Sequence, residues 1–224
     1  MGHGGSQHKK IDSLRIRAAQ YAQRLGYATL AIDAPGHGDR VSREEAARNM
    51  AETGARVSGQ APADWTPERL ARMAERTRQA VPEWKAALDV AQSFDFVGAE
   101  APVGYWGVSM GTAIGVPFVA AEPRIACAVF GLAGLRPQAS DMARAAAAIT
   151  IPVEFVFQWD DAVASREHGL ALFDAFGSTE KTMHINPGGH MGIPAFEGAS
   201  WERFFLRHLG GVAQGAPRRL AEPA

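Results

Sequence analysis

The segment Gly107-Val108-Ser109-Met110-Gly111 decides the fold and the chemistry expected of this 224-residue chain. It fits the pattern G-x-S-x-G and follows an apolar run, at the point where a strand should pass into a helix. A tight strand-to-helix turn needs glycines around the serine, because larger side chains would collide with the backbone or the next helix. The turn lifts the Ser109 hydroxyl clear of the sheet. It also leaves the Met110 amide at a helix N-terminus, where it can stabilise an oxyanion.

The residues that a serine nucleophile requires follow it in the chain. A serine hydroxyl is a weak nucleophile at neutral pH, so it needs a base and a group that orients the base. His190 lies in a glycine-rich loop after the last predicted strand, and Asp160 and Asp161 follow the strand before it. A loop histidine taken alone is more often a surface residue. Together with Ser109, however, these residues predict a catalytic triad of the serine, His190 and one of the two aspartates.

Short apolar runs alternate with longer helical patterns along the chain, which is typical of a parallel sheet covered by helices. The runs are nearly continuous, as expected for strands that are buried on both faces. They predict an α/β fold with a mostly parallel sheet of about five strands flanked by helices. The predicted strands are residues 27–33, 103–109, 125–131, 152–158 and 181–186. The predicted helices are residues 12–25, 82–93, 111–121, 140–148, 165–176 and 201–209.

Length and composition favour a single domain over residues 1–209. Hydrophobic residues make up 46% of the chain and charged residues 21%, which is typical of a globular protein with its own core. An Arg-rich stretch at residues 41–80 interrupts the alternation, and Thr66-Pro67-Glu68 within it marks a helix start. We interpret it as a helical insertion, either a solvated excursion or a lid over a pocket. Residues 210–224 lack periodicity and predict a flexible tail.

Charge, cysteine content and hydropathy argue against several classes of function. The formal net charge is -1, so no global field favours nucleic acid or an anionic membrane. The single cysteine, Cys127, cannot form an internal disulfide and is expected to be inert core. No apolar run reaches the length of a membrane span and residues 1–10 lack a signal-peptide core, so a cytoplasmic location is expected. The sequence has no metal-ligand spacing and no phosphate-binding glycine loop, and we predict neither a metal nor a cofactor.

These motifs resemble those of the α/β-hydrolase superfamily, and in particular its dienelactone-hydrolase-like esterases. The chain order of serine, aspartate and histidine is the one found there. The resemblance implies Asp161 as the acid, because in these enzymes the preceding strand often ends in G-x-x-D, with Gln158 here replacing the glycine. Dienelactone hydrolases proper use a cysteine nucleophile, so Ser109 points to ordinary ester hydrolysis. The similarity runs from His3 to about Leu209 and is carried by His3-Gly4-Gly5-Ser6 and by residues 33–40 (DAPGHGDR), 107–111 (GVSMG), 158–161 (QWDD) and 187–190 (PGGH).

The N-terminal segment departs from the pattern of these enzymes. There, the backbone amide just past His-Gly completes the oxyanion hole, which implies Gly5 beside Met110 here. That motif normally follows a central strand, whereas only two residues precede it in this chain. The resemblance therefore implies a fold without the first three strands, in which residues 27–33 pair with the strand at 103–109 or leave an open edge. Because an open edge invites another chain, we predict a homo-oligomer with residues 27–33 or the Arg-rich insertion in the contact.

The predicted function is that of a serine carboxylesterase that hydrolyses small acyl esters through an acyl-serine intermediate. The same triad would also suit a thioesterase, a lactonase or a peptidase. An alternative from another class is a catalytically impaired relative that binds a ligand or forms oligomers, as the shortened sheet suggests. His37 and Trp65 are candidates for the substrate pocket. For His37, which lies in a glycine turn, a histidine satisfied by the backbone is the more common role.

Overall fold

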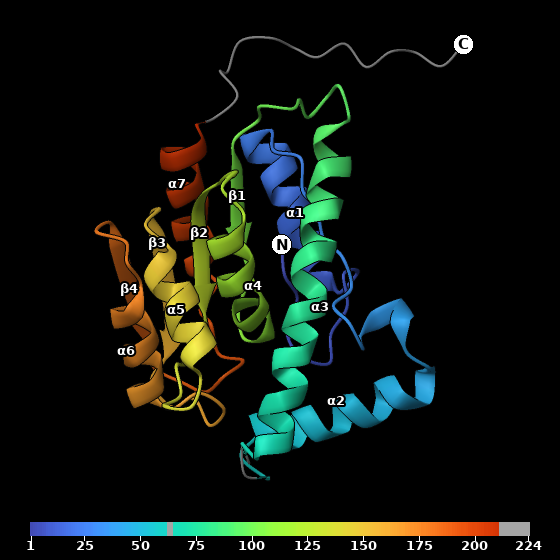
Figure 1. Ribbon diagram of the computed structural model, residues 1–224, viewed down its shortest axis with the longest axis vertical. Helices are drawn as coiled ribbons and strands as arrows, with labels where there is room; N and C mark the ends of the chain where they lie inside the picture. Colours follow the sequence, from blue (N-terminus) through green and yellow to red (C-terminus); the bar gives the residue numbers. More distant parts are fainter. Residues whose placement is uncertain (62–64, 211–224) are drawn as a thin grey trace.

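The computed structural model describes residues 1–61 and 65–210, which form a parallel four-stranded sheet with helices on both sides (Figure 1). The strand order β1-β2-β3-β4 follows the chain, so each crossover adds the next strand to the same edge. The predicted α/β fold is therefore confirmed, with four strands in place of about five. The strands are β1 (Val103–Trp106), β2 (Ile125–Gly131), β3 (Val153–Gln158) and β4 (Lys181–Asn186).

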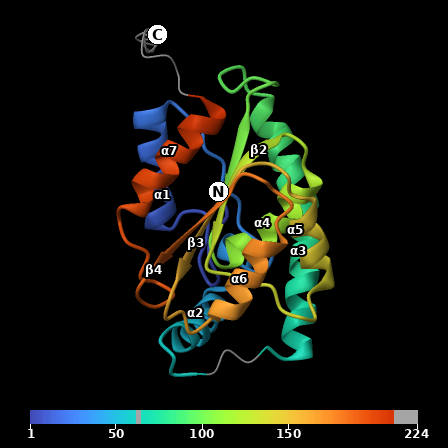
Figure 2. The ribbon, with the colours of Figure 1, turned by 90° about the vertical axis from the view of Figure 1, so that its left-hand side faces the viewer.

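The helices form two layers, one on each face of the sheet (Figure 2). The first layer contains α1 and α7, and α7 packs on β1 and β2. The second contains α3, α4, α5 and α6, in which α4 packs on β1 and β2 and also contacts α3 and α5. The bounds are α1 (Asp12–Gln20), α3 (Pro67–Gln92), α4 (Met110–Ala121), α5 (Ser140–Ala148), α6 (Arg166–Ala175) and α7 (Glu197–Leu209).

Successive residues of β2 supply two separate cores. Ala128 and Phe130 pack in the cluster beneath α3 and α4, whereas Cys127 and Val129 pack in the cluster beneath α7. None of these four residues has exposed surface. Because side chains alternate along a strand, a strand covered on both faces is apolar at consecutive positions. Burial also raises the pKa of the Cys127 thiol to about 12, in agreement with a core role.

The strand predicted at residues 27–33 is not formed, and that prediction was wrong. Residues 27–33 have no strand assignment, and on this side of the sheet the described chain has one bridge, between Gly2 and Gly107, the residue after β1. A cavity of about 550 Å³ is lined by Thr29 and Leu30 and also by residues of β1. The Met1 amino group donates to the Leu30 carbonyl at 2.6 Å, and the Gly2 amide donates to the Trp106 carbonyl at 2.8 Å. The N-terminal residues therefore lie between residues 27–33 and β1, and the two segments cannot pair at the strand spacing of about 5 Å. The apolar character of 27–33 comes from packing, since Leu30 and Ile32 contact the core under α4.

The Arg-rich insertion is helical, as predicted, and consists of α2 (Arg43–Val57) and the first part of α3. In Figure 1, α2 crosses the end of α3. The Thr66 hydroxyl accepts the Arg69 amide at 3.3 Å and caps α3, with proline at its first position. The helix expected to start at residue 82 is not separate, because α3 runs through Pro82. Its buried residues beyond the proline, Trp84 and Leu88, pack in the core beneath α4 and hold the two parts in one helix.

Two predictions concern the membrane and the C-terminal tail. Across the described ranges, no helix has the length and apolarity needed to cross a bilayer. The tail predicted from residue 210 lies outside the described residues, apart from Gly210 itself.

Candidate active site

Ser109 occupies a strained turn between β1 and α4. Its φ of 58° and ψ of -118° lie in a region that non-glycine residues rarely adopt, which is typical of functional sites. Two contacts with the end of β2 hold the turn in place. The Ser109 amide donates to the Gly131 carbonyl at 2.8 Å, and the Gly131 amide donates to the buried Thr112 hydroxyl at 2.8 Å. The neighbouring strand therefore stabilises the strained serine.

The two glycines of the motif are required by space. A Cβ at Gly107 would lie 2.7 Å from the Tyr105 phenol oxygen, and a Cβ at Gly111 would lie 2.6 Å from the Gly2 carbonyl oxygen. Both distances are shorter than any normal carbon contact. The steric argument made from the sequence therefore holds at both positions, and at Gly111 the obstacle is backbone that cannot rotate away.

Ser109, His190 and Asp161 form a continuous hydrogen-bonded chain. His190 Nε2 lies 2.9 Å from Ser109 Oγ, and His190 Nδ1 lies 2.7 Å from Asp161 Oδ2. The Asp161 side chain is fully buried, and its other oxygen accepts the amides of Val163 (2.7 Å) and Ala164 (3.0 Å). An aspartate held in this way accepts the Nδ1 proton of the histidine. The Nε2 atom is then free to accept the proton of the serine hydroxyl.

Asp160, the alternative acid, has a different contact. Its Oδ2 accepts the Gly188 amide at 3.1 Å, and its own amide donates to the Gly188 carbonyl at 3.0 Å. Asp160 therefore holds the loop that carries His190 without contacting the imidazole. The sequence left open which of the two adjacent aspartates pairs with His190, and in the structure it is Asp161 that contacts the imidazole.

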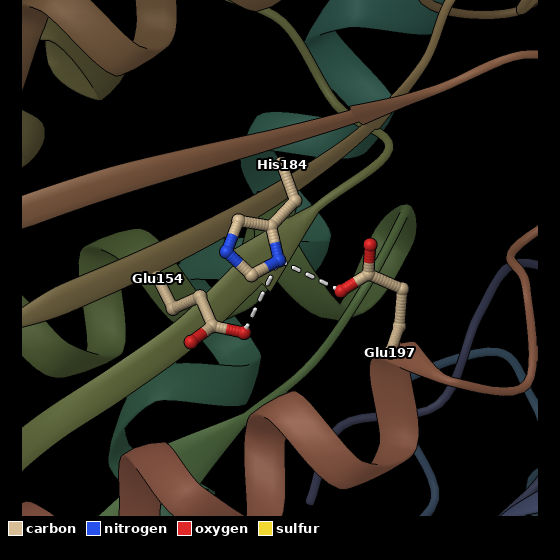
Figure 3. A group of neighbouring side chains, drawn as sticks. All are labelled: Glu154, His184 and Glu197. Atoms are coloured by element: carbon tan, nitrogen blue, oxygen red, sulfur yellow. Dashed lines mark hydrogen bonds and ion pairs between the residues drawn. The ribbon is translucent and has the colours of Figure 1, made fainter.

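The loop that carries His190 is also held at its far end, by residues that the sequence analysis missed. Glu197, at the start of α7, is almost completely buried. Its two oxygens receive hydrogen bonds from Asn186 Nδ2 and His184 Nδ1, both at 2.8 Å, so the end of β4 is tied to the start of α7. Figure 3 shows Glu197 meeting His184 from one side while Glu154 of β3 approaches from the other. The two ends of the loop between residues 186 and 197 are thereby fixed relative to one another.

Glu154, His184 and Glu197 are also the one group in the described part of the chain with the donor atoms of a metal site. One donor atom from each lies within 4.8 Å of the others. Glu154 Oε1 is buried without a hydrogen bond, 3.8 Å from His184 Nδ1, and burial raises the pKa of Glu154. None of the three lines the pocket of Ser109. The sequence carries no motif for this group, because its members come from two strands and a helix.

The amides of Gly5 and Met110, the predicted oxyanion hole, both line the pocket that contains Ser109 and His190. Among the hydrogen bonds of residues 1–61 and 65–210, none uses either amide as donor. The segment before Gly5 is positioned by His3, whose Nε2 accepts the Ala34 amide at 3.0 Å. The other ring nitrogen lies 2.8 Å from the Gly4 carbonyl, and only a neutral imidazole satisfies both contacts. Burial lowers the pKa of His3 accordingly.

The second loop of the pocket, residues 33–40, depends on Asp33. This buried carboxylate accepts the Lys9 amide at 2.8 Å, the Asp39 amide at 3.1 Å and the Lys9 ammonium group. Burial alone would raise the pKa of Asp33, but these contacts outweigh it and lower the pKa to about 2. His37, at the centre of the loop, lines the pocket and also contacts the Pro35 carbonyl at 3.1 Å. His37 thus lies in the pocket lining and is also in contact with the backbone of its own turn. Burial lowers its pKa to about 4.

The pocket has a volume of about 310 Å³ and brings together residues that are distant in sequence. Trp65, the other pocket candidate, lines it from the Arg-rich insertion, with the Arg136 guanidinium 3.7 Å from the centre of its ring. Sequence reasoning located the insertion and the tryptophan but did not identify the arginines that face Ser109. The pocket's lining includes Gly5, His37, Trp65, Ser109, Met110 and His190, and the acid Asp161 lies behind His190.

Comparison with known proteins relates this chain to solved structures. No protein-family model and no curated protein matches it. A PEG-bound cold-adapted esterase from an Arctic intertidal metagenomic library is 33% identical, with a TM-score of 0.72 over 93% of this chain and 80% of that one. A Pyrococcus furiosus esterase shares the fold at 13% identity and a TM-score of 0.65, over 93% of this chain and 81% of its own. An acetyl xylan esterase from Paenibacillus sp. R4 does so at 16% identity and a TM-score of 0.66, over 93% and 73%.

The relationship to the metagenomic esterase is the one that decides the family. The 33% identity extends over 93% of this chain and 80% of the other, so the relationship rests on the sequence as well as on the fold. The parallel sheet flanked by helices described above agrees with it. This chain belongs to the esterases of the α/β-hydrolase type.

Proposed function

We propose that the protein is a serine carboxylesterase that hydrolyses small acyl esters through an acyl-serine intermediate. The observation that carries the proposal is the hydrogen-bonded chain from Asp161 through His190 to Ser109, which ends in a cavity. A buried chain of this kind activates a hydroxyl that would otherwise be a poor nucleophile. The volume of about 310 Å³ favours a short acyl ester, because it lies at the lower end of the range for small-molecule sites.

The reaction would follow two symmetrical stages. Ser109 Oγ attacks the ester carbonyl carbon while its proton passes to His190 Nε2, and the carbonyl oxygen becomes an oxyanion. The unpaired amides of Gly5 and Met110 would hold that oxyanion, and the N-terminus of α4 adds its partial positive charge. Collapse of the intermediate breaks the bond to the alcohol oxygen, which leaves with the proton from His190. A water molecule then repeats the sequence on the acyl-serine and releases the carboxylic acid.

The segments at residues 33–40 and 187–190 support a place near the dienelactone-hydrolase-like esterases. In dienelactone hydrolases proper a cysteine would be the nucleophile, whereas Ser109 would form an oxygen ester with the acyl group. We therefore infer ordinary ester hydrolysis rather than lactone specialism. Every step uses groups of the chain itself and water.

The experiment combines turnover with covalent labelling. Purified protein is expected to release p-nitrophenol from p-nitrophenyl acetate and to gain the mass of one fluorophosphonate probe less HF, because Ser109 Oγ displaces the fluoride from phosphorus. Ser109→Ala should lose roughly a millionfold in kcat, because a triad without its nucleophile retains only binding and oxyanion stabilisation. Circular dichroism checks that the variant is folded. Turnover by pure Ser109→Ala protein above a few per cent of the wild-type rate would exclude the proposed mechanism.

A further inference from the structure

We propose that the pocket recognises esters that carry a second, ionised carboxylate, such as half-esters of short dicarboxylic acids. This inference rests on the proposed esterase function and specifies its substrate class. Its basis is the charge of the pocket. Among the described residues that line it, Glu52 is the one carboxylate, whereas the arginines are Arg56, Arg69, Arg72, Arg76 and Arg136.

Arg76 contacts the residue that follows the nucleophile. It projects from α3, is half-buried, and places Nη1 3.8 Å from the sulfur of Met110, the residue that follows the nucleophile. No carboxylate of the described chain forms an ion pair with it. Burial lowers the pKa of Arg76, and the neighbouring Arg72 lowers it further. A desolvated guanidinium without a counter-ion costs free energy that an incoming anion would recover.

Arg136, in the segment after β2, is a second cation that lines the pocket. Its guanidinium stacks on the Trp65 ring at 3.7 Å, which fixes the plane of the group and leaves the nitrogens at its edge for a ligand. It is also half-buried, and burial, with a contribution from Arg69, lowers its pKa to about 10. In the described ranges no carboxylate pairs with Arg136. The planar edge of a guanidinium matches the two oxygens of a carboxylate.

Other arginines of the chain, in contrast to Arg76 and Arg136, form ion pairs with carboxylates of the described residues. Arg40 binds both oxygens of Glu83, at 2.6 and 2.9 Å, and Arg124 binds Glu122 and Asp89. Within the pocket, Arg56 lies 3.8 Å from Glu52. The inference therefore depends on Arg76 and Arg136, which line the same cavity as Ser109 and have no carboxylate partner within residues 1–61 and 65–210. Any positive charge near Ser109 would stabilise an oxyanion from every ester, so the distinguishing property is a preference for an anionic over a neutral ester.

The first test measures that preference. The kcat/KM for monomethyl glutarate is compared with that for methyl pentanoate, a neutral ester of similar length, by following acid release. We expect at least a tenfold preference for the half-ester in the wild type. We also expect Arg76→Met and Arg136→Gln each to lower the ratio of the two kcat/KM values by about tenfold, with Arg76→Lys retaining part of it. The ratio cancels any general disturbance of the turn at Ser109.

The control is Arg78→Met, which removes an exposed arginine from the same helix that pairs with Glu75 and does not line the pocket. This variant should keep the wild-type ratio. A wild-type ratio near one, or a ratio unaffected by both pocket variants, would overturn the inference and leave the esterase proposal standing.

A second measurement separates the ligand class from the reaction. Ser109→Ala protein is titrated with glutarate by calorimetry, and binding is expected that weakens at least tenfold when Arg76→Met or Arg136→Gln is added. If glutarate binds in this way but no ester is hydrolysed, the esterase proposal fails while the anion site is retained. Absence of glutarate binding together with absence of a substrate preference would exclude the anion site.

Discussion

Asp161 contacts His190 through Oδ2 at 2.7 Å, whereas the adjacent Asp160 contacts the backbone of Gly188. The two carboxylates are one residue apart, yet only one reaches the imidazole. The difference arises where β3 ends, because the turn after Gln158 directs one side chain toward the interior and leaves the other at the loop surface. Substitution of the two aspartates is therefore expected to affect catalysis to different extents.

Asp161→Asn is expected to lower kcat by about a thousandfold to ten-thousandfold, because the amide would stabilise the wrong tautomer of His190. Asp160→Asn should cost less than about tenfold, since it weakens one hydrogen bond that holds the loop. Both variants are assayed with the same p-nitrophenyl ester after a check of folding by circular dichroism. The reverse ranking would assign the role of acid to Asp160.

Glu197→Gln is expected to lower the free energy of unfolding by about 1–3 kcal/mol, because it leaves the buried Asn186 amide and the half-buried His184 imidazole imperfectly paired. The loop that carries His190 would lose its fixed end. We therefore expect kcat to fall by about tenfold with little change in KM, since misplacement of a catalytic group by 1 Å can cost about a hundredfold.

Glu202→Gln, also on α7, is the matched control for this change. Its partner Arg24 is largely exposed, and such surface pairs contribute about 0–1 kcal/mol. Urea unfolding and steady-state kinetics of both variants give the comparison. Equal effects of the two substitutions would contradict a positioning role for Glu197.

Stability should fall as the pH is lowered from about 6.5 to about 4, in part because of His37. Its pKa lies at about 4 in the folded protein against an ordinary value of 6.5, so in this window the unfolded chain takes up a proton that the folded protein does not. The direction of the shift at His3 is the same. Asp33 adds a separate loss at lower pH, as its carboxylate becomes protonated between 3.8 and about 2.

The measurement is the free energy of unfolding in urea at several pH values for wild type and His37→Gln. The variant should show a shallower loss between pH 6.5 and 4, and its curve should run parallel to the wild type above pH 7. Identical slopes in the acidic window would show that His37 is not the group responsible.

We propose that two copies of the chain associate through the surface near residues 27–33. Beyond the Gly2–Gly107 bridge, the outer edge of β1 has no ladder partner among the described residues, and an apolar cavity of about 550 Å³ adjoins it. Phe94 and Phe96 stack at this cavity with half or more of their surface exposed. Open sheet edges and exposed aromatic pairs of this kind favour association.

Light scattering across a dilution series should give twice the mass of one chain at micromolar concentration. The double variant Phe94→Ser and Phe96→Ser should shift the mass toward that of one chain while the far-ultraviolet circular dichroism stays the same. A wild-type mass that remains at one chain throughout the series would rule out the association.

The sequence by itself was sufficient for the parts of the protein that depend on local pattern. The runs at 125–131 and 181–186 are strands with those bounds. For 125–131 the reason is that a strand buried on both faces is apolar at consecutive positions, whereas 181–186 forms the half-exposed edge strand. The turn at Ser109 was recognisable from the spacing of its glycines, although only Gly107 is required by a contact close in the chain, with Tyr105, while Gly111 is required by the distant Gly2. Thr66 likewise marked the start of α3 through a bond to its own first turn.

Only the tertiary structure decided features that depend on contacts between distant segments. Residues 27–33 have the composition of a strand but face the N-terminal residues instead of β1, and Pro82 is tolerated because the residues after it are buried against α4. The cluster of Glu154, His184 and Glu197 joins two strands and a helix. Arg76 and Arg136 come from segments 60 residues apart and face one cavity. Local pattern determines which backbone conformation a segment prefers, whereas the burial and pairing of a charge are determined by whatever the fold places opposite it.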